Sequence, residues 1–524
     1  MIKPCKALSI LLIILSNIMI FIANSSANNL TINNIFLQAR NPSSNTVVVQ
    51  FDVSWENSWK TKINHDAAWI TIRLYDPSVT PNSKNLCELS ASGLNPTGTT
   101  VDSDLEIYVP ADKKGLFIRP ADYGTFETVS SASTQVKIDY STCGFAQADS
   151  VNVSVFGVEM VYIPEGAFYA GDYEASGAAL HQGSSDSDPW YISSSSAISV
   201  TNAVSNGYRY VSASNTSEDT TGASFTIAAT FPKGYSPFYV MKYELTEEQW
   251  AEFVNSLPSA AARSNRDVTN SSHKNSDTVV KRNTLSCSGS PLSCATDRSA
   301  RAVNYISWMD LAAFLDWAAL RPVSELEFEK AARGPVLPVA GEFSWGSTAI
   351  TAATTISGSD ENGTEMVTTS AANAHYGDNT LSGGDSANGA DYQKGPLRAG
   401  IFAQSSATRT SAGGGYYGVL ELSGNLRERV VTIGNTTGRA FTGTHGDGIL
   451  STASGFEGNA TNSDWPGIDG TPARGVSGAD GSGSRGGGWE DSSTRLRISD
   501  RSDAANADAS ALSNSGGRGA RSYE

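Results

Sequence analysis

The sequence predicts an all-β sandwich at the N-terminus, followed by a larger α+β domain with little regular secondary structure. Three observations support this fold class. Apolar residues alternate along two early segments, Val47–Trp55 and Ile70–Leu74. Capping-box patterns then open helices after Thr246 and Ser324. Beyond Gly334, short apolar runs alternate with polar and glycine-rich stretches, which is typical of loops and short strands.

The first 27 residues have the pattern of a secretory signal peptide. Lys3 and Lys6 precede an apolar core, Ala7–Ala23, and the segment Ser25–Ala27 offers small residues for cleavage. Cys5 precedes the apolar core, so it is misplaced for a lipoprotein box. No second apolar segment of about 18 residues follows. We therefore expect a protein of the extracellular surface that has no membrane span.

The charge of the chain excludes some partners. Its formal net charge is -16, and only 17% of its 524 residues are charged. An acidic surface of this kind repels nucleic acids and anionic membranes, but it is compatible with bound cations. We therefore expect no nucleic-acid partner.

Residues 28–155 are predicted to form an Ig-like β-sandwich, because short alternating strands are separated by turn residues such as Asn41-Pro42-Ser43. Three tryptophans of this region, Trp55, Trp59 and Trp69, lie on or beside the alternating strands. We interpret them as core residues, in preference to a ligand platform.

The leading segment Asn28–Arg40 carries apolar residues at Leu30, Ile32, Ile35 and Leu37. Two interpretations stay open. The segment is either the first strand of its own sandwich, or an assembly strand that joins the sheet edge of a neighbouring subunit.

Four cysteines follow the signal peptide, and an even number in a secreted chain suggests disulfides. Pairing between sequence neighbours gives Cys87–Cys143 and Cys287–Cys294. The alternative is free buried thiols.

The larger domain is expected to span residues 156–524. A polar, Gly- and Ser-rich stretch at residues 171–229 indicates a long insertion. Three helices follow: one from the capping box at Thr246, one over about Trp308–Leu320, and one from Ser324.

The stretch Gly418–Val431 combines an apolar strand with a Ser-Gly-Asn turn. Glu421 and Glu428 flank this turn and can point at one spot. Carboxylates together with turn carbonyls are the oxygen ligands that a hard cation such as Ca²⁺ uses. The alternative is a solvated hairpin with two glutamates on the surface.

Five ordered stretches, spanning about 365 residues, resemble the formylglycine-generating enzyme (FGE, sulfatase-modifying factor) superfamily, whose fold is related to that of C-type lectins. The N-terminal sandwich is similar to a domain that accompanies FGE-like domains in some secreted bacterial proteins. The matching stretches are MVYIPEGAFYAGD (Met160–Asp172), FYVMKYELTEEQWAEFVN (Phe238–Asn255), RAVNYISWMDLAAFLDWAALRPVSELEFEKAARG (Arg301–Gly334), GVLELSGNLRERVV (Gly418–Val431), and SRGGGWEDSSTRLRISDR with GGRGAR (Ser484–Arg521).

The resemblance implies an oxidase whose copper is held by two cysteines just after the Gly-Gly-Ser-Trp motif. Here Gly486–Trp489 is followed by Glu490 and Asp491, and no cysteine occurs after Cys294. Thiolates are the ligands that hold Cu(I), so we expect neither copper nor FGE activity. The five histidines are scattered, which argues against iron chemistry as well. An enzyme of another chemistry, using Glu490, Asp491 and nearby serines, is a remote alternative.

The resemblance also implies two structural Ca²⁺ sites. The first maps onto Glu421, the Gly424 and Leu426 carbonyls, and Glu428. Arg427 and Arg429 replace the family's tryptophans and could pair with these carboxylates. The second maps onto Asn373, the Ala374 carbonyl and Asp391.

These observations favour a secreted, non-enzymatic structural or assembly protein, a subunit of a surface layer or filament that binds itself or other surface proteins. The first alternative is a calcium-assisted module that binds glycan or protein in secretion, adhesion or gliding. An FGE-like oxidoreductase is more remote, because function resides in the site and not in the fold.

Overall fold

The computed structural model describes residues 29–173, 175–183, 187–202, 207–358, 364–404 and 406–523. The predicted signal peptide, residues 1–27, lies outside this part of the chain. Among the described residues, no helix combines the length and the apolar character needed to cross a membrane.

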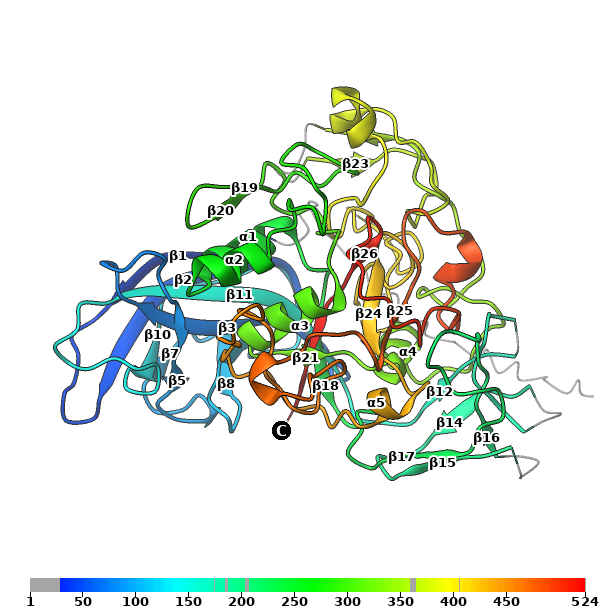
Figure 1. Ribbon diagram of the computed structural model, residues 1–524, viewed down its shortest axis with the longest axis horizontal. Coiled ribbons are helices and arrows are strands. Elements are labelled where there is room, and N and C mark those ends of the chain that lie inside the picture. Colours follow the sequence, from blue (N-terminus) through cyan, green and yellow to red (C-terminus); the bar gives the residue numbers. More distant parts are fainter. Residues whose placement is uncertain are drawn as a thin grey trace, which may run out of the picture.

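Two antiparallel sheets form the predicted sandwich, at the left of Figure 1. The first sheet has the order β1-β2-β10-β5, with β7 also paired to β10; these strands are β1 (Thr31–Leu37), β2 (Thr46–Lys60), β5 (Glu88–Leu89), β7 (Thr99–Thr100) and β10 (Gly124–Asp139). The sandwich strands of the second sheet are β3 (Asp66–Tyr75), β4 (Asn85–Leu86), β6 (Gly93–Leu94), β8 (Leu105–Val109) and β9 (Leu116–Pro120). Alternate residues of β2 pack against β3 between the sheets, as the period-2 pattern predicts. Trp55, Trp59 and Trp69 are all buried, which confirms them as core residues.

The second sheet continues from the sandwich into the larger domain. Strand β11 (Asn152–Ile163) pairs with β3 over Asn152–Val161 and with β18 (Phe238–Met241) over Met160–Ile163. Beyond β18 lie β27 (Gly519–Ser522) and β21 (Arg321–Pro322), so the full order is β21-β27-β18-β11-β3-β9-β8-β6. The expected boundary between residues 155 and 156 therefore falls inside a strand that both domains share.

A buried charge cluster lies on this shared sheet. Lys242, directly after β18, is 3.2 Å from an Asp66 oxygen on β3 and 3.0 Å from a Glu159 oxygen on β11. Asp66 also accepts the backbone N–H of Trp59 and the hydroxyl of Ser58. One cation thus links three strands across the joint between the domains.

Strand β1 pairs with β2 of its own chain and lies at the edge of its sheet. Its apolar residues Leu30, Ile32, Ile35 and Leu37 are partly buried against the sandwich core. Gly157 of β11 makes room for them, because a Cβ there would lie 2.8 Å from Ile32 Cδ1 and 2.9 Å from Leu30 Cδ2. The described arrangement is therefore the intramolecular one; strand exchange between subunits stays a prediction.

The described residues of the polar stretch 171–229 are folded, and their strands lie at the lower right of Figure 1. Buried Leu180, Trp190, Tyr210 and Ile227 join it to the main core. The strands of this region are β12 (Phe168–Ala170) paired with β14 (Trp190–Ile192), and a sheet of order β13-β16-β15-β17 made of β13 (His181–Gln182), β15 (Ile198–Val200), β16 (Tyr208–Arg209) and β17 (Phe225–Ile227).

The predicted helices are present and begin at their capping boxes. Thr246 and Gln249 cap one, and Ser324 and Glu327 cap another. The helices are α1 (Glu247–Ser256), α2 (Ala260–Asn265), α3 (Trp308–Trp317), α4 (Glu325–Arg333) and α5 (Thr436–Arg439). The stripe Trp250, Phe253, Val254 and Leu257, on α1 and its C-cap, is buried as expected.

The remainder is built of loops and short elements, as predicted. These elements are β19 (Ser286–Ser288), β20 (Ser293–Ala295), β22 (Ile356–Ser357), β23 (Met366–Val367), β24 (Arg427–Val431), β25 (Ser482–Arg485), β26 (Ser515–Gly516), and the 3-10 turns η1 (Gly384–Asn388), η2 (Ala390–Tyr392), η3 (Pro472–Arg474) and η4 (Ser493–Leu496). Both predicted disulfides are present, Cys87–Cys143 and Cys287–Cys294.

Candidate functional site

The turn between Glu421 and Glu428 is buried and irregular. The apolar strand expected before it does not form, because Gly418 and Glu421 have left-handed φ angles of 93° and 57° that an extended strand cannot include. The residues after the turn do form a strand, β24, which pairs with β25 and β26. Glu421 and Glu428 are 6% and 2% exposed, so the interpretation as a solvated hairpin is wrong.

Glu428 is bound by an arginine that sequence reasoning missed. Arg518 Nε donates to Glu428 Oε2 at 2.7 Å, and Arg518 Nη2 donates to Glu428 Oε1 at 2.6 Å. Arg427 and Arg429, which the sequence allowed as alternative partners of these carboxylates, point elsewhere. Arg427 pairs with Asp491, and Arg429 donates to the carbonyls of Asp508 and Ser510.

Glu421 faces a different environment. Its Oε1 accepts the backbone N–H of Gly400 at 2.6 Å, whereas its buried Oε2 has no hydrogen-bond partner among the described residues. Burial raises the pKa of this carboxyl to about 7 against the opposing charge of Arg518. A cavity of about 10 Å³, room for roughly one water molecule or ion, is lined by Glu421, Gly424, Asn373 and His375.

The ring of His375 adds a second acceptor without a partner. Its Nε2 bonds to the carbonyl of Gly395 at 2.9 Å, so this nitrogen carries the proton and the buried, unpartnered Nδ1 carries a lone pair. Burial lowers the pKa of His375 to about 4, which keeps the ring neutral. Because Glu421 Oε2 and His375 Nδ1 are buried without partners, each would be stabilised by a hydrogen-bond donor or a cation in the cavity.

Glu244 is a further buried carboxylate at this turn. It accepts the side-chain N–H of Asn425 at 2.5 Å and the backbone N–H of Leu426 at 3.0 Å. Burial, followed by the charges of Glu421 and Glu428, raises its pKa well above the usual range. This residue was not among those selected from the sequence. It lies within the matched stretch Phe238–Asn255, two residues before the capping-box residue Thr246.

The residues of the second predicted cation site have other partners or lie at the surface. Asn373 Oδ1 accepts the N–H of Thr351, and the Ala374 carbonyl accepts the N–H of Ala353, both at 2.9 Å. Asp391 is exposed on η2. The residues of the first predicted site also have separate partners. Both oxygens of Glu428 are bound by Arg518, whereas Glu421 accepts the N–H of Gly400. One side chain from each set, Glu421 and Asn373, instead lines the same cavity.

The resemblance implies copper ligands in the segment after Gly486–Trp489. In this segment Asp491 forms an ion pair with Arg427. Arg427 Nε and Nη2 donate to the two oxygens of Asp491 at 2.7 and 2.5 Å, and the Gly488 N–H donates to Asp491 as well. Glu490 accepts the hydroxyl of Ser513. A neighbouring cavity, also of about 10 Å³, has room for roughly one water molecule.

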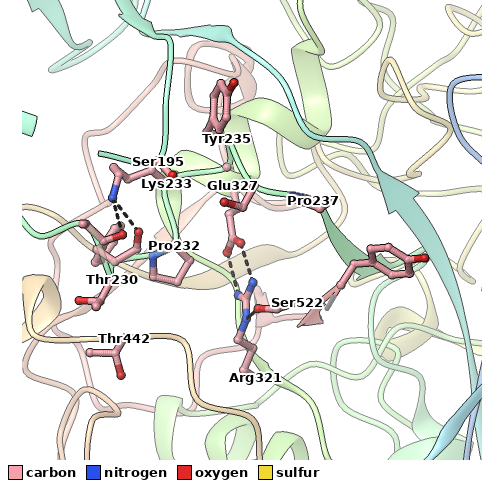
Figure 2. Close-up of a pocket in the computed structure, with 15 residues that line it drawn as sticks. Ser195, Thr230, Pro232, Lys233, Tyr235, Pro237, Arg321, Glu327, Thr442 and Ser522 are labelled. Carbon is pink, nitrogen blue, oxygen red and sulfur yellow. Dashed lines mark hydrogen bonds and ion pairs between the residues drawn. The ribbon is translucent and has the colours of Figure 1, made fainter. Parts of the chain in front are cut away.

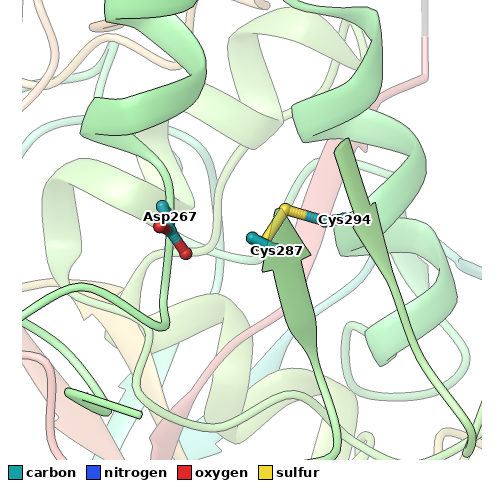
Figure 3. A group of neighbouring side chains, drawn as sticks. All are labelled: Asp267, Cys287 and Cys294. Carbon is teal, nitrogen blue, oxygen red and sulfur yellow. A yellow bond between two sulfur atoms is a disulfide. The ribbon is translucent and has the colours of Figure 1, made fainter. Parts of the chain in front are cut away.

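One group of three potential metal ligands lies among the described residues, and Figure 3 shows it. Asp267 lies beside Cys287 and Cys294, but the two sulfurs are joined to each other. Asp267 accepts the N–H and the hydroxyl of Thr269. The thiolates that a metal would need are therefore engaged in the disulfide.

A pocket of about 190 Å³ opens between the insertion and the C-terminus (Figure 2). Arg321 and Glu327 form a two-point ion pair at its wall, at 2.9 and 2.7 Å. The Lys233 ammonium donates to three backbone carbonyls, and burial lowers its pKa to about 8. The pocket is smaller than the roughly 300–1,000 Å³ of sites that enclose drug-sized ligands.

The family model of the sulfatase-modifying factor enzyme 1-like domain matches residues 149–522. This range includes the shared strand β11, the insertion and all five motif stretches. No curated protein matches the chain. Since the match covers well over half of the sequence, the protein belongs to the sulfatase-modifying factor enzyme 1-like (FGE-sulfatase) domain family.

Proposed function

We propose that this protein is a secreted, non-enzymatic structural or assembly subunit of an extracellular layer or filament, built on the FGE fold. The observation that carries the non-enzymatic part is Asp491. It stands in the segment where the resemblance implies a copper-binding cysteine, and Arg427 binds both of its oxygens. The cysteines of the described residues are all paired in disulfides, which supports the same proposal.

The position of β1 supports assembly. It is an edge strand whose apolar residues cover the sandwich core, and it follows directly on the predicted signal peptide. A strand in this position can be replaced by the same strand of a neighbouring subunit without loss of contacts.

The test locks β1 to β2. Thr31 and Ser54 are register partners, and their side-chain oxygens are 2.7 Å apart, so T31C/S54C can form a disulfide within the chain. We expect filaments or sheets of the native secreted protein in negative-stain micrographs, and we expect the oxidised T31C/S54C variant to stay monomeric until it is reduced.

The matched control is S54C/S130C, which joins β2 to β10 and leaves β1 free. It should assemble like the wild type. Normal assembly of oxidised T31C/S54C would remove strand exchange from the proposal, and a wild-type protein that stays monomeric at every concentration would remove assembly altogether.

A calcium-assisted module for glycan or protein is the second proposal. The pocket beside the Arg321–Glu327 ion pair, which is lined by both polar and apolar residues, favours it. A glycan array probed with and without Ca²⁺ is the corresponding experiment, and an absence of calcium-dependent hits would count against it. The FGE-like oxidoreductase is the third, and failure to oxidise a cysteine peptide in the presence of copper would remove it.

We also propose that structural Ca²⁺ binds at the cavity that Glu421, Asn373 and Gly424 line. The residues fit a cation because Glu421 Oε2 is buried without a partner, although His375 Nδ1 is a ligand that Ca²⁺ uses rarely. Ca²⁺ at a hundredfold over its Kd would stabilise the fold by about 2.7 kcal/mol. We expect chelation to lower the Tm of the wild type and to leave the Tm of E421Q unchanged; an equal response of both would contradict this placement.

A further inference from the structure

The guanidinium of Arg518 lies in a cage of oxygens. It donates to the two carboxylate oxygens of Glu428 at 2.6 and 2.7 Å, and to the carbonyls of Leu420 at 2.7 Å, Met241 at 3.0 Å and Lys242 at 3.3 Å. Arg518 is 1% exposed, so these five oxygens surround a cation that is shielded from water. We refer to this arrangement as the Arg518 cage.

The cage draws on three separate parts of the chain. Leu420 and Glu428 flank the buried turn, Met241 ends β18 with Lys242 directly after it, and Arg518 directly precedes β27. The backbone N–H of Leu420 also donates to the Lys242 carbonyl, which fixes one side of the cage to the other. Arg518 therefore holds together elements that are distant in sequence.

The surroundings of Arg518 carry an excess of negative charge. Glu428 pairs with it directly, and Glu244 and Glu421 contribute further attraction that supports its charged form. Burial raises the pKa of Glu428, and Arg518 opposes this rise. Removing a cation from such a place leaves uncompensated buried carboxylates, which is strongly destabilising.

An all-oxygen set of one carboxylate and several backbone carbonyls is the kind of ligand set that a hard divalent cation uses. A guanidinium satisfies the same oxygens through directed N–H bonds, and it is attached to the chain. We propose that Arg518 is the resident cation of this cage, that no divalent metal binds there in the wild type, and that removing the side chain opens a Ca²⁺ site.

This inference is independent of the proposed assembly function and separate from the cavity at Glu421. The cage and the cavity use different carboxylates, so variants can tell them apart. E421Q tests the cavity, whereas variants of Arg518 and Glu428 test the cage.

The experiment measures the Tm of the full-length secreted protein in EGTA and in 10 mM Ca²⁺, for wild type, E428Q, R518A and R518A/E428Q. We expect R518A to melt well below the wild type in EGTA. In Ca²⁺ it should recover beyond any response of the wild type, by about 1 °C for each tenfold excess over Kd. R518A/E428Q is the matched control and should not show this additional recovery, because it lacks the carboxylate.

E428Q keeps the inference testable even where R518A does not fold. Because Arg518 blocks the cage, E428Q should respond to Ca²⁺ as the wild type does. A wild-type response that disappears in E428Q would overturn the inference, since a metal would then already use Glu428. A folded R518A whose response to Ca²⁺ equals that of the wild type would overturn it as well.

Discussion

His273 and Arg266 share one buried carboxylate, Asp310. Arg266 is 2.6 Å from one Asp310 oxygen, and His273 Nε2 is 2.9 Å from the other. Burial disfavours the imidazolium, but the charge and the hydrogen bond of Asp310 outweigh it and raise the pKa of His273. This aspartate also accepts from Ser307, so the ion pairs are attached to the cap of α3.

The raised pKa of His273 predicts a pH-dependent contribution to stability. A group whose pKa is raised on folding stabilises fully below its unfolded value, about 6.5, and loses this contribution as pH rises through the folded value. We therefore expect H273Q to lower the Tm more at pH 6 than at pH 8.5.

The control for this prediction is H65Q. Burial, followed by the charges of Arg119 and Lys60, lowers the pKa of His65 to about 3, so this ring is neutral at both pH values. Its replacement should lower the Tm less at pH 6 than at pH 8.5, the opposite order to H273Q, because at pH 6 the unfolded imidazole binds a proton that the folded ring does not. Equal losses for H273Q at the two pH values would contradict the assignment of a charged pair.

The site residues show how far a sequence alone can reach. Glu421 and Glu428 were predicted because two carboxylates flank a turn, which is a local signal. Arg518 was not, because it is 90 residues from Glu428 and reaches it only when β18, β24 and β27 come together. Glu421 lines a cavity, whereas Glu428 is bound by Arg518. This difference also arises from tertiary packing, which the local sequence does not show.

Helix α4 owes its start to Ser324, whose Oγ accepts the N–H of Glu327 and donates to the carbonyl of Pro232. Ser324 is fully buried. We expect S324A to lower the free energy of unfolding by about 1–2 kcal/mol, as the loss of a buried cap does. Urea denaturation of S324A and wild type gives the value.

The comparison variant is S259A at the start of α2. Ser259 accepts one N–H, that of Ala262, it is only partly buried, and α2 is short. We expect a smaller loss for S259A. Equal losses for the two variants would show that the second hydrogen bond of Ser324 adds nothing.

Elements were predictable where their signal is local. A capping box spans only four residues, so both helix starts were found at the correct residue. The strand expected at Val419–Leu422 is wrong because an apolar pattern does not reveal positive φ angles at Gly418 and Glu421. For β1, the sequence left two partners open, since an edge strand carries the same pattern whichever chain it completes.

At the scale of the whole molecule, the shared strand β11 joins strands of the two domains into one continuous sheet. Lys242 forms ion pairs with both Asp66 and Glu159 across that sheet. We expect K242M to destabilise the protein by about 3–5 kcal/mol, because two buried carboxylates lose their cation. Calorimetry of the wild type should show both domains unfolding in one transition, and that of K242M should show the same transition at lower temperature.

The control is K114M, whose partner Glu88 is on the surface of the sandwich. Its loss should be at most about 1 kcal/mol. Two separate transitions in the wild type would contradict the view that β11 couples the domains.

The continuity of this sheet has a mechanical consequence. A molecule that is pulled between its sandwich and its second domain carries the load across the long ladder of β3 and β11, which runs from Asn152 to Val161. Tension along the strands shears this ladder, so its hydrogen bonds resist together and do not open one after another. The two domains are therefore connected by a continuous strand ladder that shares the load over ten residue pairs, and not by a flexible linker.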